Sequence, residues 1–336
     1  MPRNLLTWND HSLDSWHRLR ERAVTLGAEG ARWADRKAGR SIALVFFNSS
    51  LRTRTSMELA AEQLGAHSTT LVPGQGTWGF EWREDVVMDG DAAEHIREAV
   101  GVLSRYYDAL GVRVFATQSD YARDRDEVLL DRFAEAAEVP IVNMESAFHH
   151  PCQALGDAAT LRTHFDESLS GREFVLSWAP HPKALPMAVP NSALLMAARE
   201  GMNVTVARPD GFALDNGIME EARQIARDQG GTVRESADQT EAFEDAHVIY
   251  AKSWGGQAVY TGPDREARLR ADHGDWTINE SLMNRTDEGI FMHCMPVRRG
   301  VVVDDAVLDG PRSIHLDQAE FRLHAQKAIL ESVWDL

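Results

Sequence analysis

The chain has 336 residues, of which 43% are hydrophobic and 26% charged, the balance of an ordinary globular protein long enough for two domains. A formal net charge of −17 argues against a nucleic-acid partner, because binding a phosphate backbone requires a basic surface. No apolar run reaches the length of a membrane span, and Met1–Thr7 lacks the pattern of a signal peptide. Two cysteines, Cys152 and Cys294, are too few for a disulfide framework, so we expect a cytoplasmic protein with no membrane partner.

The first part of the chain alternates helical and strand patterns. One or two amphipathic helices are expected within Asn9–Arg36, and Pro73–Met88 is a long aromatic- and glycine-rich segment without a clear period, which we expect to be a functional loop. Strands are expected at Ser41–Phe47, Thr69–Val72, Gly111–Phe115 and Val139–Met144. Helices are expected at Met57–Leu64, Ala92–Tyr107 and Tyr121–Ala137. Repeated alternation of this kind is typical of βαβ units and a parallel sheet.

A second series of helices and strands follows Gly171. Pro151 occupies the favoured first position of a helix, Pro151–Phe165, which precedes that series. Strands are expected at Glu173–Trp178, Asn203–Ala207, Thr232–Glu235, His247–Ala251, Ile290–Cys294 and Ser313–Leu316. Helices are expected at Asn191–Glu200, Ile218–Gln229 and Gln318–Trp334. The predicted fold is therefore α/β with two domains, each a parallel β-sheet flanked by helices, covering residues 1–148 and 149–317, with helix 318–336 packing back on the first domain.

The stretch Ser41–Glu58 carries the clearest functional signal. An unbroken apolar run is typical of a strand buried on both faces, and it leads through Asn48, Ser49 and Ser50 into a short polar turn, Arg52-Thr53-Arg54-Thr55-Ser56, that precedes the helical pattern from Met57. The N-terminus of a helix offers free backbone N–H groups and a positive dipole end, and the arginines and hydroxyls add donors. We interpret this stretch as a cradle for a phosphate-like oxyanion. The alternative is a solvated basic turn that only caps the helix.

Other polar clusters follow predicted strands or open predicted helices. They are Gly111-Val112-Arg113, His149-His150-Pro151-Cys152-Gln153, His293-Cys294-Met295-Pro296-Val297-Arg298-Arg299 and Ala319-Glu320-Phe321-Arg322. Two further patterns are rejected. Gly74–Gly79 matches G-x-G-x-x-G, but no helical apolar face follows it, so no dinucleotide is expected. The histidines and cysteines match no zinc-ligand spacing, so no metal is expected.

The chain resembles the aspartate/ornithine carbamoyltransferase superfamily. The resemblance rests on Phe47–Thr55, His150–Gln153 and His293–Pro296, which occur in the family's order. Within the superfamily the chain is similar to the N-acetylornithine branch, with N-succinylornithine enzymes close by. That branch is indicated by Lys252-Ser253-Trp254-Gly255, Trp178–Lys183, Trp78 and Glu145, whereas the D-x-x-x-S-M-G motif of plain ornithine enzymes is missing.

The resemblance implies an enzyme that moves the carbamoyl group of carbamoyl phosphate to the side-chain amine of an N-acylated ornithine in arginine biosynthesis. It implies that 1–148 is the carbamoyl-phosphate domain and 149–317 the acceptor domain of a homotrimer that needs no cofactor. Carbamoyl phosphate would be held by Ser50, Leu51, Arg52, Thr53, Arg113, His150, Gln153, Cys294, Met295 and Arg322. Of these, Arg52, Arg113, His150 and Cys294 would be catalytic. The acceptor would be held by Trp78, which reaches in from a neighbouring subunit, and by Glu145, Lys252, Pro296 and Arg298.

Departures from the pattern fall on the acceptor side. Ala93 stands where acetyl-specific relatives have glutamate and succinyl-specific relatives have proline, and Val302 stands where a lysine is usual. Losing a glutamate makes room and removes a charge that would repel a second carboxylate, which favours a larger or acidic acyl group. Phe321 and Pro190 also depart from the pattern. Two alternatives stay open: another small amine acceptor, including ornithine, or a non-catalytic homologue that binds carbamoyl phosphate.

Overall fold

The structure is a computed structural model that describes residues 4–30, 39–165 and 168–336. The chain divides into two compact units. The first contains residues up to Thr117 together with Ala122–Gly156 and Arg322–Leu336, and the second contains Gln118–Tyr121 and Asp157–Phe321. Each unit holds one main parallel sheet with helices packed against it, which confirms the predicted α/β class. Which ligand each predicted domain binds remains a prediction.

The first unit is built on a four-stranded parallel sheet in the order β2-β1-β5-β6. The strands of this sheet are β1 (Ser41–Phe46), β2 (His67–Leu71), β5 (Ala109–Arg113) and β6 (Ile141–Glu145). The helices are η1 (Trp8–Asp10), α1 (Leu13–Glu29), α2 (Arg52–Gln63), α3 (Ile96–Tyr106), α4 (Tyr121–Arg125) and α5 (Val128–Ala136). Two further helices, α6 (Pro151–Phe165) and α13 (His315–Val333), run from one unit into the other along the chain.

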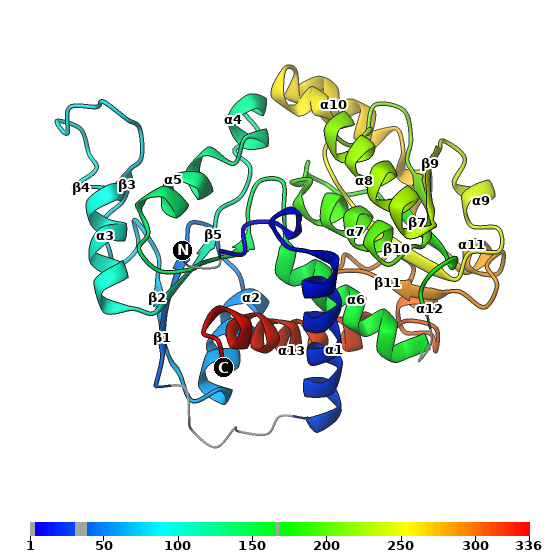
Figure 1. Cartoon of the computed structure of the whole chain (residues 1–336). Helices are drawn as coiled ribbons and strands as arrows, with labels where there is room; N and C mark the ends of the chain where they lie inside the picture. The colour runs from blue at the N-terminus through cyan, green and yellow to red at the C-terminus, as the bar shows by residue number, and fades with distance from the viewer. Residues whose placement is uncertain (1–3, 31–38, 166–167) are drawn as a thin grey trace. The chain divides into compact units, whose positions relative to one another are not determined.

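The core of the first unit explains its layers. Ala43 and Val45 of β1 pack with Val100 of α3 and Phe133 of α5, so these helices cover one face of the sheet. Alternate side chains of a strand point to opposite faces, and β1 is buried from its second residue to its last, as expected for a central parallel strand. Figure 1 shows α3 and α5 on one side of this sheet and α2 on the other.

Most of the predicted loop Pro73–Met88 has no regular structure. Within it, β3 (Phe80–Glu81) pairs in parallel with β4 (Glu94–His95). The side chain of Trp78 is 59% exposed, and its indole Nε1 donates a hydrogen bond to Glu94 Oε2 at 2.6 Å. Gly74–Gly79 opens no helix, as expected for a pattern that is not a dinucleotide site.

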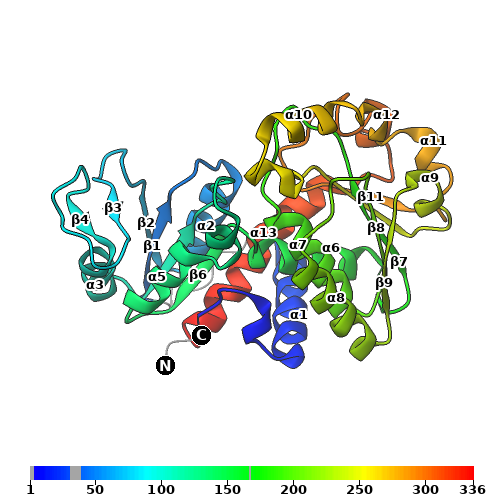
Figure 2. The same cartoon turned by 90° about the horizontal axis from the view of Figure 1, so that it is seen from above.

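The second unit is built on a five-stranded parallel sheet in the order β11-β10-β7-β8-β9. Its strands are β7 (Glu173–Trp178), β8 (Asn203–Ala207), β9 (Thr232–Ser236), β10 (Val248–Lys252) and β11 (Ile290–Met292). Its other helices are α7 (Ala188–Arg199), α8 (Asn216–Gln229), α9 (Gln239–Ala242), η2 (Gln257–Tyr260), α10 (Pro263–Ala271), η3 (Gly274–Trp276), α11 (Glu280–Met283) and α12 (Asp305–Leu308). Figure 2 shows α7 and α8 side by side along one face of this sheet.

An aromatic core fixes the ends of β7 and β10. Trp178 and Trp254 are both fully buried, and each indole N–H finds a backbone acceptor. Trp178 Nε1 donates to Trp254 O and Trp254 Nε1 donates to Phe212 O, both at 2.9 Å. A buried tryptophan contributes a large apolar surface while its polar edge is satisfied, so these residues stabilise the loops after the strands.

Two predicted elements are wrong. Tyr121–Ala137 is not one helix, because Glu127 between α4 and α5 adopts a left-handed backbone with φ 50°. Ser313–Leu316 is not a strand: Ser313 forms only an isolated bridge with Phe291, and α13 begins at His315. Residues 31–36 of the predicted N-terminal helical region lie outside the described residues.

Candidate active site

The site in the first unit begins at the turn between β1 and α2. Asn48 Oδ1 accepts a hydrogen bond from Phe115 N at 2.8 Å, which ties this turn to the segment that follows β5. Ser50 Oγ accepts from Thr53 N at 3.1 Å, and Arg52 is the first residue of α2. The predicted order of strand, turn and helix is therefore present, with Leu51 71% exposed at the tip of the turn. The start of α2 is the positive end of its helix dipole, which suits an anion.

Arg113 lies at the end of β5 and is 7% exposed. Its Nη1 donates to Thr53 Oγ1 at 3.3 Å and also pairs with the carboxylate of Glu145, the last residue of β6. The guanidinium carbon lies 4.5 Å above the centre of the Phe115 ring. A buried guanidinium held by a hydroxyl, a carboxylate and an aromatic face has little conformational freedom left to lose when a ligand binds.

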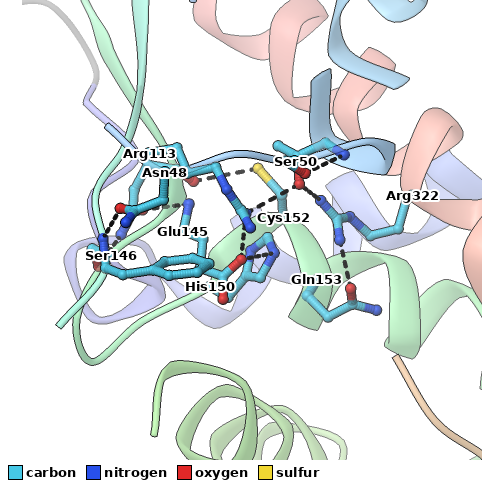
Figure 3. Close-up of polar contacts among 12 residues, drawn as sticks. Asn48, Ser50, Arg113, Glu145, Ser146, His150, Cys152, Gln153 and Arg322 are labelled. Atoms are coloured by element: carbon cyan, nitrogen blue, oxygen red, sulfur yellow. Dashed lines mark hydrogen bonds and ion pairs between the residues drawn. The ribbon is translucent and has the colours of Figure 1, made fainter. Parts of the chain in front are cut away.

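His150, Gln153 and Arg322 complete this cluster (Figure 3). Arg322 Nη1 donates to Gln153 Oε1 at 2.5 Å, and Arg322 Nη2 donates to Thr53 Oγ1 at 3.2 Å. His150 Nε2 lies 3.4 Å from Glu145 Oε2. Side chains from α2, β5, β6, α6 and α13 thus meet, although Thr53 and Arg322 are 269 residues apart.

Burial sets the protonation of this cluster. Burial, and then the charges of Arg322 and Arg113, hold the pKa of His150 well below its usual range, so its imidazole is neutral. Burial raises the pKa of Cys152 to about 11, and its thiol donates to Asn143 O at 3.4 Å, so Cys152 packs as a thiol and is not a nucleophile. The cluster presents two fixed guanidinium groups and one neutral imidazole.

The predicted site residues of the second unit lie at the ends of β10 and β11. Lys252 is 7% exposed, and its Nζ donates to Ser253 O at 3.1 Å. Cys294 and Met295 follow β11 and are partly buried, whereas Pro296 and Arg298 are exposed. The peptide bond between Met295 and Pro296 is cis. Arg298 Nε donates to His181 Nε2 at 2.9 Å, and burial lowers the pKa of His181, which keeps it available as an acceptor.

A buried network behind β10 and β11 was missed by the sequence analysis. Asp157, fully buried on α6, accepts hydrogen bonds from Tyr250 OH at 2.9 Å and from Gln318 Nε2 at 2.8 Å. Gln318 Oε1 in turn accepts from His293 N at 2.9 Å, which fixes the backbone just before Cys294. The signal that could have revealed this network is Asp157, the one acidic residue of the predicted helix Pro151–Phe165, which stands among small and apolar residues.

Metal and membrane sites can be assessed for the described residues. Among them, no group of three or more histidine, cysteine, aspartate or glutamate side chains is placed to hold a metal ion. In the same part of the chain, every helix is too short or too polar to cross a membrane.

Solved structures similar to this chain are carbamoyltransferases with bound ligands. Acetylornithine transcarbamylase complexed with acetylcitrulline superposes with a TM-score of 0.95 at 42% identity, over 98% of this chain and 99% of that one. Variants of N-acetyl-L-ornithine transcarbamylase in which a glutamate is replaced by proline or alanine are complexed with carbamyl phosphate and N-succinyl-L-norvaline. The proline variant also superposes with a TM-score of 0.95 at 42% identity, over 98% of this chain and 99% of that one.

Relatives and family models agree with those structures. N-acetylornithine carbamoyltransferase of Xanthomonas axonopodis pv. citri is 45% identical over 297 residues, which are 88% of this chain and 86% of the relative. N-succinylornithine carbamoyltransferase of Bacteroides fragilis is 36% identical over 87% of this chain and 86% of the relative. Residues 3–163 match the carbamoyl-P binding domain and residues 187–333 the Asp/Orn binding domain of aspartate/ornithine carbamoyltransferase. The chain therefore belongs to the aspartate/ornithine carbamoyltransferase family.

Proposed function

We propose that the protein transfers the carbamoyl group of carbamoyl phosphate to the side-chain amine of an N-acylated ornithine. The products are N-acyl-citrulline and phosphate, and the reaction serves arginine biosynthesis. The observation that carries this proposal is the buried cluster of Arg113, Arg322 and Thr53 at the N-terminus of α2, with neutral His150 beside it. Fixed positive charges at a helix N-terminus suit a phosphorylated donor.

The donor-site residues form groups according to the part of carbamoyl phosphate that each would contact. Arg52, Arg322 and the backbone of α2 would bind the phosphate and stabilise it as it gains charge on leaving. Arg113, Thr53 and His150 would donate to the carbamoyl oxygen as that oxygen becomes negative. Gln153 would orient the carbamoyl amide, while Ser50, Leu51, Cys294 and Met295 would complete the donor site. Positioning and electrostatics supply the acceleration, without a covalent intermediate, a metal or a cofactor.

The proton of the attacking amine needs a separate acceptor. An imidazole whose pKa lies well below its usual range, as burial and the two arginines dictate for His150, is a poor base. His150 therefore acts as a hydrogen-bond donor, and the departing phosphate takes the proton.

The acceptor would be held by Glu145, Lys252, Pro296 and Arg298, together with Trp78 of a neighbouring subunit in a homotrimer. Trp78 is 59% exposed in one chain even though its Nε1 donates to Glu94, so much of its side chain is accessible to a contact with another subunit. The cytoplasm is the compartment that fits a biosynthetic enzyme with few cysteines.

Ala93 and Val302 help to decide which acyl group the acceptor carries. Ala93 is exposed and stands where acetyl-specific relatives have glutamate, and the glutamate-substituted relatives described above hold a succinyl compound. Val302 is buried and cannot offer a charge to the acceptor. These two positions support N-succinylornithine, or an acyl group larger than acetyl, as the preferred acceptor class.

One assay tests the proposed reaction and its alternatives. Formation of the ureido product from carbamoyl phosphate is measured with ornithine, N-acetylornithine, N-succinylornithine and a few diamines. Turnover with an acylated ornithine is expected, and turnover only with another amine, or none at all, contradicts the proposal. The variant Arg52→Ala should weaken carbamoyl-phosphate binding, measured by calorimetry, by about 100-fold, because a charged hydrogen bond to phosphate is lost. An exposed arginine of α3, changed in Arg105→Ala, serves as the control.

A further inference from the structure

Glu127 makes a set of contacts that the reaction above does not use. Its carboxylate accepts three hydrogen bonds from one short segment: from Ser146 Oγ at 2.6 Å, from Phe148 N at 2.8 Å and from Ala147 N at 3.1 Å. The residue adopts a left-handed backbone with φ 50°, which is uncommon for glutamate. Backbone in that region costs free energy and persists where the surroundings determine it, so this conformation demands an explanation.

The segment held by Glu127 joins two residues of the site. Ser146 directly follows Glu145, which pairs with Arg113, and Phe148 lies two residues before His150. Ser146 N donates to His149 O at 2.8 Å, and Asn143 Nδ2 donates to Ser146 Oγ at 2.8 Å. One carboxylate therefore fixes the turn that sets the spacing between Glu145 and His150. Figure 3 shows Ser146, Glu145 and His150 together.

The ionised form of Glu127 is the form that suits these donors. A carboxylate can accept at both oxygens, whereas a carboxylic acid or an amide presents a hydrogen at one of them to a backbone N–H. Burial raises the pKa of Glu127 to about 7, and the charge of Asp131 on α5 acts in the same direction. The other titratable neighbours are Asp124 and Asp126 on its own segment and His149 on the held turn, where burial lowers the pKa of His149 to about 4.

We propose that Glu127 is a positioning residue, whose carboxylate holds the 146–148 turn so that Glu145 and His150 keep their places beside Arg113. The proposal rests on the proposed carbamoyl transfer. It names a residue that touches no substrate and acts through the backbone of the turn. A displacement of about 1 Å in a reacting group can cost about 100-fold in rate, so a small shift of this turn is enough to matter.

The test compares Glu127→Gln with Glu135→Gln, which removes one negative charge from an exposed position of α5. We expect kcat of Glu127→Gln to fall between about 10-fold and 100-fold, and Glu135→Gln to match the wild type. The unfolding midpoint in urea at pH 8 should be unchanged or raised in Glu127→Gln. The folded-state pKa of about 7 lies above the usual value of 4.5, so ionisation of Glu127 costs stability as the pH rises through that window. The glutamine of the variant carries no such cost.

If Glu127 only stabilised the fold, kcat and the unfolding midpoint would change together. If activity falls only together with the unfolding midpoint at pH 8, or if kcat is unchanged, the proposal is wrong. Wild-type activity should also show a rise centred near pH 7 that is missing from the pH profile of Glu127→Gln. The same profile in both proteins contradicts the proposal.

Two further measurements apply if Glu127→Gln does not fold or if the wild type turns over no acylated ornithine. If Glu127→Gln does not fold, Ser146→Ala removes one of the three donors and should lower kcat about 3-fold to 10-fold, and unchanged kcat overturns the proposal. If the wild type turns over no acylated ornithine, the proposed function fails, and Glu127 is judged on carbamoyl-phosphate binding by calorimetry. Weaker binding in Glu127→Gln than in Glu135→Gln, with faster amide exchange in 146–149, then supports the proposal. Equal binding and exchange overturn it.

Discussion

The candidate residues of the two units are held in different ways. In the first unit, Thr53, Arg113, Gln153 and Arg322 are buried and bond to one another through their side chains. In the second unit, Lys252 bonds to a backbone carbonyl, and two candidate residues after β11, Pro296 and Arg298, are exposed. A site made of interlocked buried side chains tolerates little change, whereas partly exposed residues can vary singly. The interlocked donor residues keep the family pattern, whereas the departures lie outside that cluster: Ala93 is exposed in the first unit and Val302 is buried in the second.

The largest effect should come from Arg322→Ala. This change removes a donor to phosphate together with the hydrogen bonds that Arg322 donates to Gln153 and Thr53, so kcat/KM should fall about 1,000-fold. The control is Arg105→Ala, an exposed arginine of α3 that pairs with Glu138. A loss below about 10-fold would show that the buried cluster is not the donor site.

The buried histidines of the first unit should make it sensitive to acid. The folded-state pKa of His149, about 4, lies below the usual value of 6.5, so unfolded chains bind more protons and stability falls as the pH drops from 6.5 to 4. Over this pH range His149 changes the free energy of unfolding by about 3 kcal/mol. Urea unfolding of His149→Asn between pH 7 and pH 4.5 should therefore depend less on pH than that of the wild type. An equal dependence would exclude His149 as the cause.

Loss of the acceptor-side lysine should act on one substrate only. Lys252→Ala should raise the KM for the acylated ornithine about 30-fold, because one charged contact is lost, and leave carbamoyl-phosphate affinity within about 2-fold. Steady-state kinetics and calorimetry measure the two quantities separately. If the affinity for carbamoyl phosphate falls together with the affinity for the acylated ornithine, the donor and acceptor residues do not act independently.

The smallest effect should come from Ala93→Glu. The new carboxylate would repel an acidic acyl group and leave a neutral one unaffected, so the ratio of kcat/KM for N-succinylornithine to that for N-acetylornithine should fall about 10-fold. Ala93→Gln, of similar size but uncharged, separates charge from volume. An unchanged ratio in both variants would remove Ala93 from the specificity site.

Local patterns predicted much of this molecule. The apolar run from Ser41 and the proline at position 151 mark β1 and α6 correctly, because a strand buried on both faces and a helix first turn leave strong local signals. Contacts between distant segments leave no such signal. No sequence spacing indicates that Arg322 bonds to Gln153 across 169 positions or that Asp157 reaches Gln318.

The two misread elements have physical causes. The helical pattern of Tyr121–Ala137 continues through Glu127, whose backbone is set by tertiary hydrogen bonds and not by local propensity. The short run at Ser313 is compatible with a strand or with a helix start, and one bridge to Phe291 was not enough to extend the sheet.

The position of Arg322 has a consequence for how the protein is made. The first unit includes Arg322–Leu336, which follow the rest of that unit only after the whole of Asp157–Phe321. A nascent chain can build the strands around Arg113 early, yet Thr53 has no second guanidinium beside it until Arg322 has left the ribosome. A chain that stops before Arg322 would therefore keep Arg52 and the N-terminus of α2 but lack one buried guanidinium, and it should bind phosphate more weakly than a chain that includes Arg322.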